Sequence, residues 1–237
     1  MESQTPPTSQ PHQVQIPALE IALVMIATFF VFLFISVASE FTLGDAPTLI
    51  VGELLILIVP LIYLQMKHVD IKSYVRIDLN PKYILIGVGC GALLLLLNIA
   101  ITDTLTYFFG TSTAVQQSNQ LITTLSGQPA GLAAVAISLV LAGICEEFAF
   151  RGFLQNSIFH AMKAGKYQNF AFPVALIIAA GIFGLFHFDP QGIYTLAAGI
   201  SGLALGLIYQ RWNYTTSATA HAFMNIIVLV FLLIGIG

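Results

Sequence analysis

Long apolar runs of helical length dominate this chain and constrain its fold more than any other feature. Crossing the ~30 Å hydrocarbon layer of a bilayer takes about 20 mostly apolar residues in a helix. Only 8% of the 237 residues are charged, whereas soluble domains carry about 25%. Because so few charges cannot cover a water-facing surface, the sequence predicts an integral membrane protein. We expect the lipid bilayer as its surroundings and no nucleic acid as a partner.

Polar or Pro/Gly-containing breaks separate the apolar runs into candidate spans. They predict an all-α fold, a polytopic membrane helical bundle of about seven transmembrane helices around an intramembrane polar cavity. The third and fourth runs are longer than one span needs, so they must tilt, kink or extend into water. The predicted spans are residues 18–38, 47–66, 83–109, 131–162, 170–187, 192–210 and 216–236.

Lysine and arginine predict how the bundle lies in the membrane. Apart from Arg151, they follow predicted spans two, four and six, and the alternate loops contain none. Cytoplasmic loops collect these residues, so we expect a cytoplasmic N-terminus and an external C-terminus, in a bacterial plasma membrane. Residues 1–17 lack the basic and apolar regions of a cleavable signal peptide and predict a disordered cytoplasmic tail. Residues 18–130 are assigned as N-terminal transmembrane helices, and residues 131–237 as a C-terminal core.

The stretch CEEFAFRGF places three charged side chains inside the fourth apolar run. An ionisable residue at mid-span costs about 2.5–3.5 kcal/mol on insertion scales, so it faces protein or a water-filled cavity. Glu147 and Arg151 are four residues apart and can pair on one helix face. Glu146 points about 100° away and is a candidate general base. The alternative is that all three form a buried ionic clamp with a purely structural role.

Two further apolar runs carry polar residues at helical spacing. His187 follows Phe183 by four residues, and His221 precedes Asn225 by four. Each histidine alone could be a helix-packing residue, but every polar group in an apolar interior must be compensated. Glu146, the two imidazoles and the Asn225 amide could together activate water and stabilise an oxyanion during amide hydrolysis.

A divalent metal is the alternative use of the same groups. Glu146, His187 and His221 are a donor set that is common at catalytic zinc. The sequence has no HExxH motif, the strongest sequence signature of such a site. The sequence therefore leaves open whether zinc or another divalent metal is required, or no cofactor at all.

Small residues in the apolar runs predict close packing rather than chemistry. Cys90 and Cys145 lie in apolar runs, where a free thiol behaves as a small hydrophobic side chain. Gly199, Gly202 and Gly206 in the sixth span provide positions where a neighbouring helix can approach closely.

Three motifs, in order and on separate apolar runs, resemble those of the CPBP family, the CAAX proteases and bacteriocin-processing enzymes also called the Abi family. The resemblance covers about residues 131–230. It rests on EExxxR, FxxxH and HxxxN, matched by Glu146, Glu147 and Arg151, by Phe183 and His187, and by His221 and Asn225.

This resemblance implies an intramembrane endopeptidase with a cavity open to the cytoplasm. By position, Glu146 would activate the hydrolytic water with His187, while His221 and Asn225 would hold the oxyanion. Glu147, Arg151 and Phe183 would support them. The expected substrate is a membrane-associated peptide or protein, with bacteriocin or signalling-peptide processing or self-immunity as possible roles. A non-catalytic immunity or scaffold protein and a proton-coupled transporter remain alternatives, the latter because buried Glu and His can form a proton relay.

The depths of the two histidines conflict with straight, membrane-spanning helices. If the fifth span begins near residue 170, His187 lies roughly 25 Å deep, whereas His221 lies only about 8–9 Å into the seventh span. They can meet only if the fourth helix extends out of the membrane, if the fifth begins outside it, or if the turn at RWNYT is sunk within the protein. Irregular backbone at depth is tolerated where it lines a cavity.

Overall fold

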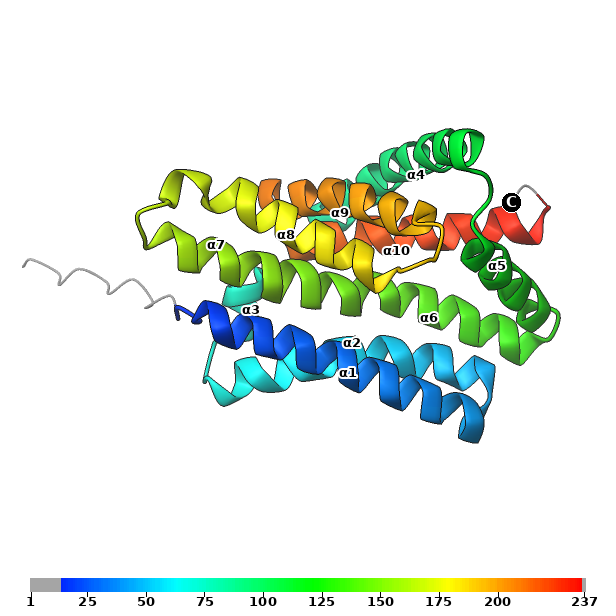
Figure 1. The fold of residues 1–237 in the computed structure, drawn as a ribbon, viewed down its shortest axis with the longest axis horizontal. Helices are drawn as coiled ribbons and strands as arrows, with labels where there is room; N and C mark the ends of the chain where they lie inside the picture. The colour runs from blue at the N-terminus through cyan, green and yellow to red at the C-terminus, as the bar shows by residue number, and fades with distance from the viewer. Residues whose placement is uncertain (1–13, 236–237) are drawn as a thin grey trace, which may run out of the picture.

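The computed structural model describes residues 14–235, and all regular structure in this range is helical (Figure 1). Seven of the helical segments are long and apolar enough to span a membrane, so the predicted all-α membrane bundle is confirmed. The elements are α1 (Ala18–Leu43), α2 (Asp45–Met66), α3 (Ile71–Val75), α4 (Pro81–Phe109), α5 (Thr113–Ser126), α6 (Pro129–Glu147), η1 (Phe148–Gln155), α7 (Asn156–Lys163), η2 (Gln168–Phe170), α8 (Ala171–Phe186), α9 (Ile193–Arg211) and α10 (Tyr214–Leu233).

The fourth predicted span forms the centre of the bundle. There α6, η1 and α7 run on as one continuous rod, with α1 and α2 along one side of it and α8, α9, α10 and α4 on the other (Figure 1). The segment η1 is a π-helix. Such wider turns are rare and occur mostly as short segments, frequently at functional sites. All eight residues of η1 are buried.

Two of the breaks between the predicted spans contain helices in the structure. The polar stretch after the third span holds α5, a helix with no buried residue, and the basic stretch after the second span holds the short α3. Residues 1–13 of the predicted disordered tail lie outside the described residues. Within the rest of that tail, Ile16 is buried and packs in the main apolar core.

Small residues let the central helices approach closely. A Cβ atom added to Gly143 of α6 would lie 2.7 Å from the Cβ of Ala222 in α10. One added to Gly202 of α9 would lie 3.1 Å from the ring of Phe183 in α8. The prediction that the sixth span packs closely through its glycines is therefore confirmed. These contacts set the spacing of the helices that carry the polar residues.

His187 and His221 can meet because α7 and α8 form a long hairpin and because the turn between α9 and α10 is buried. The connection between α7 and α8 lies at one extreme end of the molecule, whereas α9 ends and α10 begins nearer its middle (Figure 1). Asn213, in the α9–α10 turn, is buried together with the first turn of α10. His221 therefore lies deep in the protein although it is near the first residue of its helix.

Side chains satisfy the polar backbone of this buried turn. The guanidinium of Arg76 donates hydrogen bonds to the carbonyl oxygens of Tyr209 at 3.2 Å and of Trp212 at 2.5 Å. The Asn213 side chain accepts a hydrogen bond from the Thr216 N–H at 2.9 Å and caps α10. Buried helix ends require such partners, so these contacts allow the chain to reverse inside the protein.

Substitution at Gly143 tests whether this close packing is required. We expect Gly143→Ala to lower the free energy of unfolding by about 1–3 kcal/mol, because its methyl group would overlap α10. Gly89→Ala in α4 is the matched control, since a Cβ there meets no atom within 4 Å. Thermal unfolding in detergent measures both. Equal stability of the Gly143 and Gly89 variants would contradict the close α6–α10 contact.

Candidate active site

Glu146 is the next-to-last residue of α6 and lies between two histidines from other parts of the chain. Its side-chain oxygens are 3.8 Å from His187 Nε2 and 3.8 Å from His221 Nε2. The residue is 7% exposed, and its Oε2 atom is buried without a hydrogen-bond partner. The structure thus brings together three of the predicted catalytic residues, and we call Glu146, His187 and His221 the Glu–His cluster.

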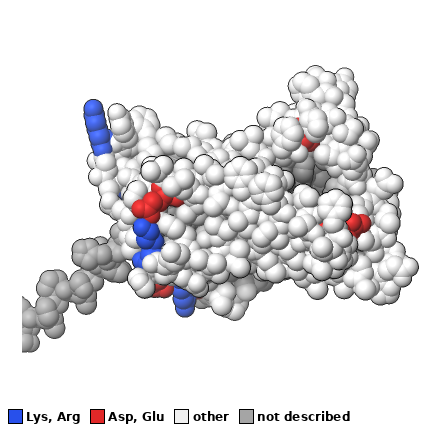
Figure 2. Space-filling model, turned by 60° about the horizontal axis from the view of Figure 1, so that its bottom comes forward, with Lys and Arg blue, Asp and Glu red and all other residues white. Residues whose placement is uncertain are grey.

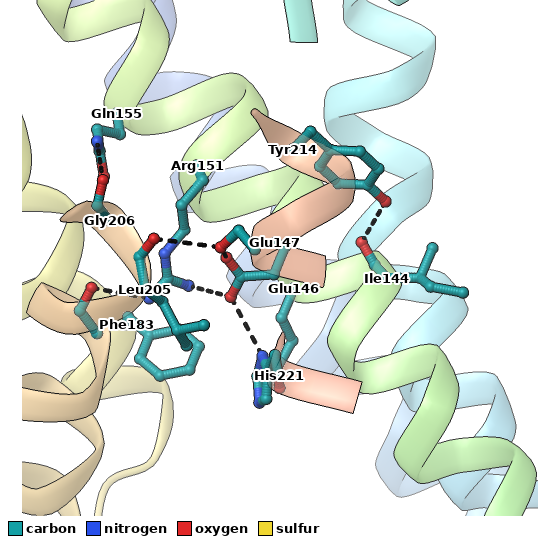
Figure 3. Close-up of polar contacts among 12 residues, drawn as sticks. Ile144, Glu146, Glu147, Arg151, Gln155, Phe183, Leu205, Gly206, Tyr214 and His221 are labelled. Atoms are coloured by element: carbon teal, nitrogen blue, oxygen red, sulfur yellow. Dashed lines mark hydrogen bonds and ion pairs between the residues drawn. The ribbon is translucent and has the colours of Figure 1, made fainter. Parts of the chain in front are cut away.

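Glu147 and Arg151 form the predicted buried ion pair beside this cluster (Figure 3). Arg151 Nη1 is 2.8 Å from Glu147 Oε1, and neither residue has exposed surface. Arg151 Nη2 also donates to the Gly202 carbonyl at 3.1 Å, and the guanidinium lies 4.3 Å from the centre of the Phe183 ring. The pair therefore joins η1 to both α8 and α9.

Glu147 also orients His221, which adds a second function to the ion pair. Its Oε1 lies 3.1 Å from His221 Nδ1, and its Oε2 accepts a hydrogen bond from Ser217 one helical turn earlier. A carboxylate that pairs with arginine can only accept hydrogen bonds, so the proton of neutral His221 lies on Nδ1. The Nε2 lone pair then faces Glu146.

His187 is oriented in the same manner by its own helix. It follows the last residue of α8, and its Nδ1 lies 2.9 Å from the carbonyl oxygen of Phe183. A carbonyl only accepts, so Nδ1 carries the proton of the neutral ring and Nε2 is again an acceptor. The Phe183 ring packs against the imidazole with centroids 4.6 Å apart, which explains the FxxxH spacing.

The Glu–His cluster therefore presents three hydrogen-bond acceptors to one another. Separations of 3.8 Å are too long for direct hydrogen bonds. A group that donates protons, such as a water molecule, could contact the carboxylate and an imidazole together. This arrangement suits removal of a proton from water, because a general base must reach the proton directly or through one water.

The donor chemistry of the cluster suits zinc, but its arrangement does not fit the metal as it stands. Among residues 14–235, no group of three or more His, Cys, Asp or Glu side chains has the geometry to hold a metal ion. Zinc would need nitrogen and oxygen ligands at about 2.0–2.2 Å.

Asn225 is one turn beyond His221 on α10. In the structure its amide donates a hydrogen bond to the carbonyl oxygen of Leu139 in α6, at 3.3 Å. This contact ties α10 to α6 two turns before Glu146. The predicted role of Asn225 in holding an oxyanion remains a prediction.

Two residues near the cluster were not predicted. Ser217 could have been found, because it precedes His221 by four residues and so shares its helix face. Glu53 of α2 is close enough to Glu146 for their charges to interact, and its Oε2 is buried without a hydrogen-bond partner. An isolated carboxylate in an apolar span was its sequence signal.

Residues 128–227 match the family described as type II CAAX prenyl endopeptidase, Rce1-like. This family is the CPBP family, so the predicted resemblance is confirmed for residues 128–227. The match supports a membrane protease. All seven motif residues lie within the matched range of this CPBP core. Searches of curated proteins and of solved structures each returned no match.

Removal of Arg151 tests the ion pair at the centre of the CPBP core. We expect Arg151→Ala to lower the free energy of unfolding by about 3–5 kcal/mol, because it leaves the buried Glu147 carboxylate without its cation. Arg211→Ala, at an exposed position, is the matched control. Denaturant unfolding in detergent compares them. An Arg151 variant as stable as the native protein would contradict a buried, charged pair.

Proposed function

We propose that this protein is an intramembrane endopeptidase in which Glu146 activates the hydrolytic water. The observation that carries the proposal is the convergence of Glu146, His187 and His221 from three helices, with both Nε2 atoms facing the carboxylate at 3.8 Å. The match of residues 128–227 to a family of membrane proteases supports the same reaction class.

In the proposed reaction, the Glu146 carboxylate removes a proton from water while the water oxygen attacks the scissile carbonyl carbon. The Nε2 of His187 accepts the second water proton as a hydrogen bond and fixes the direction of attack. When the carbon–nitrogen bond breaks, Glu146 returns its proton to the leaving nitrogen. The second water proton stays on the new carboxyl group, which then ionises and releases it to the amine or to solvent. Glu146 is left as a carboxylate, so the enzyme gains and loses no proton over the cycle.

His221 and Asn225 are proposed to stabilise the negative oxygen of the tetrahedral intermediate. The Nδ1 proton of His221 contacts Glu147, so His221 can donate to an oxyanion only through Nε2, in its doubly protonated form. Asn225 can donate through its amide, which has two protons. Each such donor contributes about 2.7–4 kcal/mol to transition-state stabilisation in well-studied proteases.

The proposed substrate is a peptide or protein held at the membrane. Prenylated C-terminal segments are one class, because the matched family is described as a CAAX prenyl endopeptidase. A bacteriocin or signalling-peptide precursor, in processing or self-immunity, is the other. The gathering of lysine and arginine at one end of the face in Figure 2 supports a cytoplasmic N-terminus, with that end toward the cytoplasm of a bacterial plasma membrane.

Replacement of Glu146 is the experiment that tests the proposed chemistry. We expect Glu146→Gln to lower kcat by at least about 10²–10⁴-fold, because an amide cannot take a proton from water. The assay is release of the C-terminal fragment from a quenched, prenylated peptide in proteoliposomes. Glu40→Gln, at an exposed position of α1, is the matched control. A Glu146 variant that is folded and fully active would refute the proposed role.

Metal removal tests whether the reaction needs a cofactor. A glutamate-type reaction predicts that turnover is unchanged after incubation with a membrane-permeant zinc chelator followed by its removal. Loss of turnover that is restored by added zinc, and by no other treatment, would instead place a metal in the Glu–His cluster. The chelated protein should keep its melting temperature, which separates loss of chemistry from unfolding.

A further inference from the structure

The loop that follows His187 is held by a compact hydrogen-bond network outside the family motifs. His187 is the first residue beyond α8, so its own helix fixes only one side of its backbone. The next segment, DPQG, contains a reverse turn in which Gly192 N–H donates to the Asp189 carbonyl at 3.0 Å. Gly192, the residue before α9, adopts φ +74°, a conformation that glycine accepts readily.

The Thr195 hydroxyl is the centre of this network. It lies 3.2 Å from the backbone carbonyl oxygen of His187 and 3.2 Å from Asp189 Oδ1. It also accepts a hydrogen bond from the Asp189 N–H at 3.0 Å, and the Thr195 N–H donates to Asp189 Oδ1 at 3.3 Å. One side chain of α9 thus contacts both the histidine backbone and the residue two positions later.

The close approach of α9 to α8 brings Thr195 within reach of His187. A Cβ atom added to Gly184 of α8 would lie 2.7 Å from the Thr195 carbonyl oxygen. Gly184 lies inside the FxxxH segment, three residues before His187. The absence of a side chain there allows the first turn of α9 to lie against the end of α8.

Asp189 is suited to be a fixed acceptor in this loop. It has no exposed surface. Burial raises the pKa of its carboxyl group, but the Ser112 hydroxyl and the N–H and O–H groups of Thr195 outweigh burial and hold that pKa below its ordinary value. A second link runs from Thr113 of α5 to Gln191 in the same loop, at 3.1 Å. The loop is therefore tied to α9 and to α5.

We propose that Asp189 and Thr195 form a clamp that positions the imidazole of His187 against Glu146. The clamp rests on the proposed peptidase function for its catalytic consequence, whereas its effect on the histidine is independent of that function. Neither residue touches the reacting atoms, so both are positioning residues. A small displacement of a catalytic group can lower turnover by about 10²-fold. A rigid attachment of the His187 backbone, just beyond the end of α8, would prevent such a displacement.

The matched pair Thr195→Val and Thr195→Ser tests the clamp. Valine keeps the shape of threonine but removes the hydroxyl, whereas serine keeps the hydroxyl. We expect Thr195→Val to lower kcat by about 10–100-fold with KM within about twofold of the native value, because the reacting geometry and not substrate binding is disturbed. Thr195→Ser should restore native kcat. Equal kcat values for the valine variant and the native protein would overturn the proposal.

A spectroscopic measurement provides a readout that does not depend on peptidase activity. The chain has five histidines, so ¹⁵N-histidine labelling in nanodiscs gives a small set of ring signals, and His187→Gln assigns those of His187. We expect Thr195→Val to shift or broaden the His187 signals and Thr195→Ser to leave them unchanged. Unchanged His187 signals in folded Thr195→Val protein would overturn the clamp.

The two readouts separate failure of the clamp from failure of the proposed function. If the native protein cleaves no peptide, but Thr195→Val changes the His187 signals and Thr195→Ser does not, the clamp stands and the peptidase function fails. If the native protein cleaves peptides while valine changes neither kcat nor the signals, the clamp alone fails. Should Thr195→Val not fold, Asp189→Asn replaces it, because an amide oxygen accepts more weakly than a carboxylate and the same changes are expected.

Discussion

The buried Glu147 carboxylate is the group on which the rest of the core depends. It contacts Arg151, His221 and Ser217, and so joins the central rod to α10. Through Arg151 it also reaches the Gly202 carbonyl of α9 and the ring of Phe183 in α8. A charge in an apolar interior is stable only when it is paired and hydrogen-bonded, so its partners must stay in place.

This network gives the two adjacent glutamates different surroundings. The side chain of Glu147 is completely occupied by its partners, whereas Glu146 makes no direct hydrogen bond to the histidines that face it. Glu147 therefore has the contacts of an ionic clamp, and the adjacent Glu146 is left without such partners, as its proposed role of general base requires. Helical rotation separates them, as neighbouring side chains point about 100° apart.

Depth in the membrane is the second constraint that shapes the site. His221 can reach Glu146 because the α9–α10 turn is buried and its carbonyl groups accept hydrogen bonds from Arg76. Arg76 belongs to a connecting segment that precedes the matched CPBP core. The N-terminal part of the chain thus completes the fold of the C-terminal core.

The sequence allowed the class, the spans and the cluster to be predicted, because hydropathy and i,i+4 spacing are local signals. It also indicated that the depths of His187 and His221 required an unusual turn. It could not indicate which of three solutions the chain adopts, since the contacts of Arg76 with the turn join residues more than 130 positions apart. Glu53 had a sequence signal, an isolated carboxylate in an apolar span, but its approach to Glu146 depends on which helices become neighbours. Thr195 was missed because its contacts with His187 and Asp189 depend on the path of the α8–α9 loop.

The most direct test of the central claim is a comparison of peptide termini in cells. Membrane and secreted peptides would be sequenced from host cells that express the native chain or Glu146→Ala at matched levels. If Glu146 is catalytic, new termini appear with the native chain alone, and these also identify the substrate. Identical termini in both samples, together with a cellular phenotype that the variant also confers, would contradict a catalytic Glu146 and favour a scaffold.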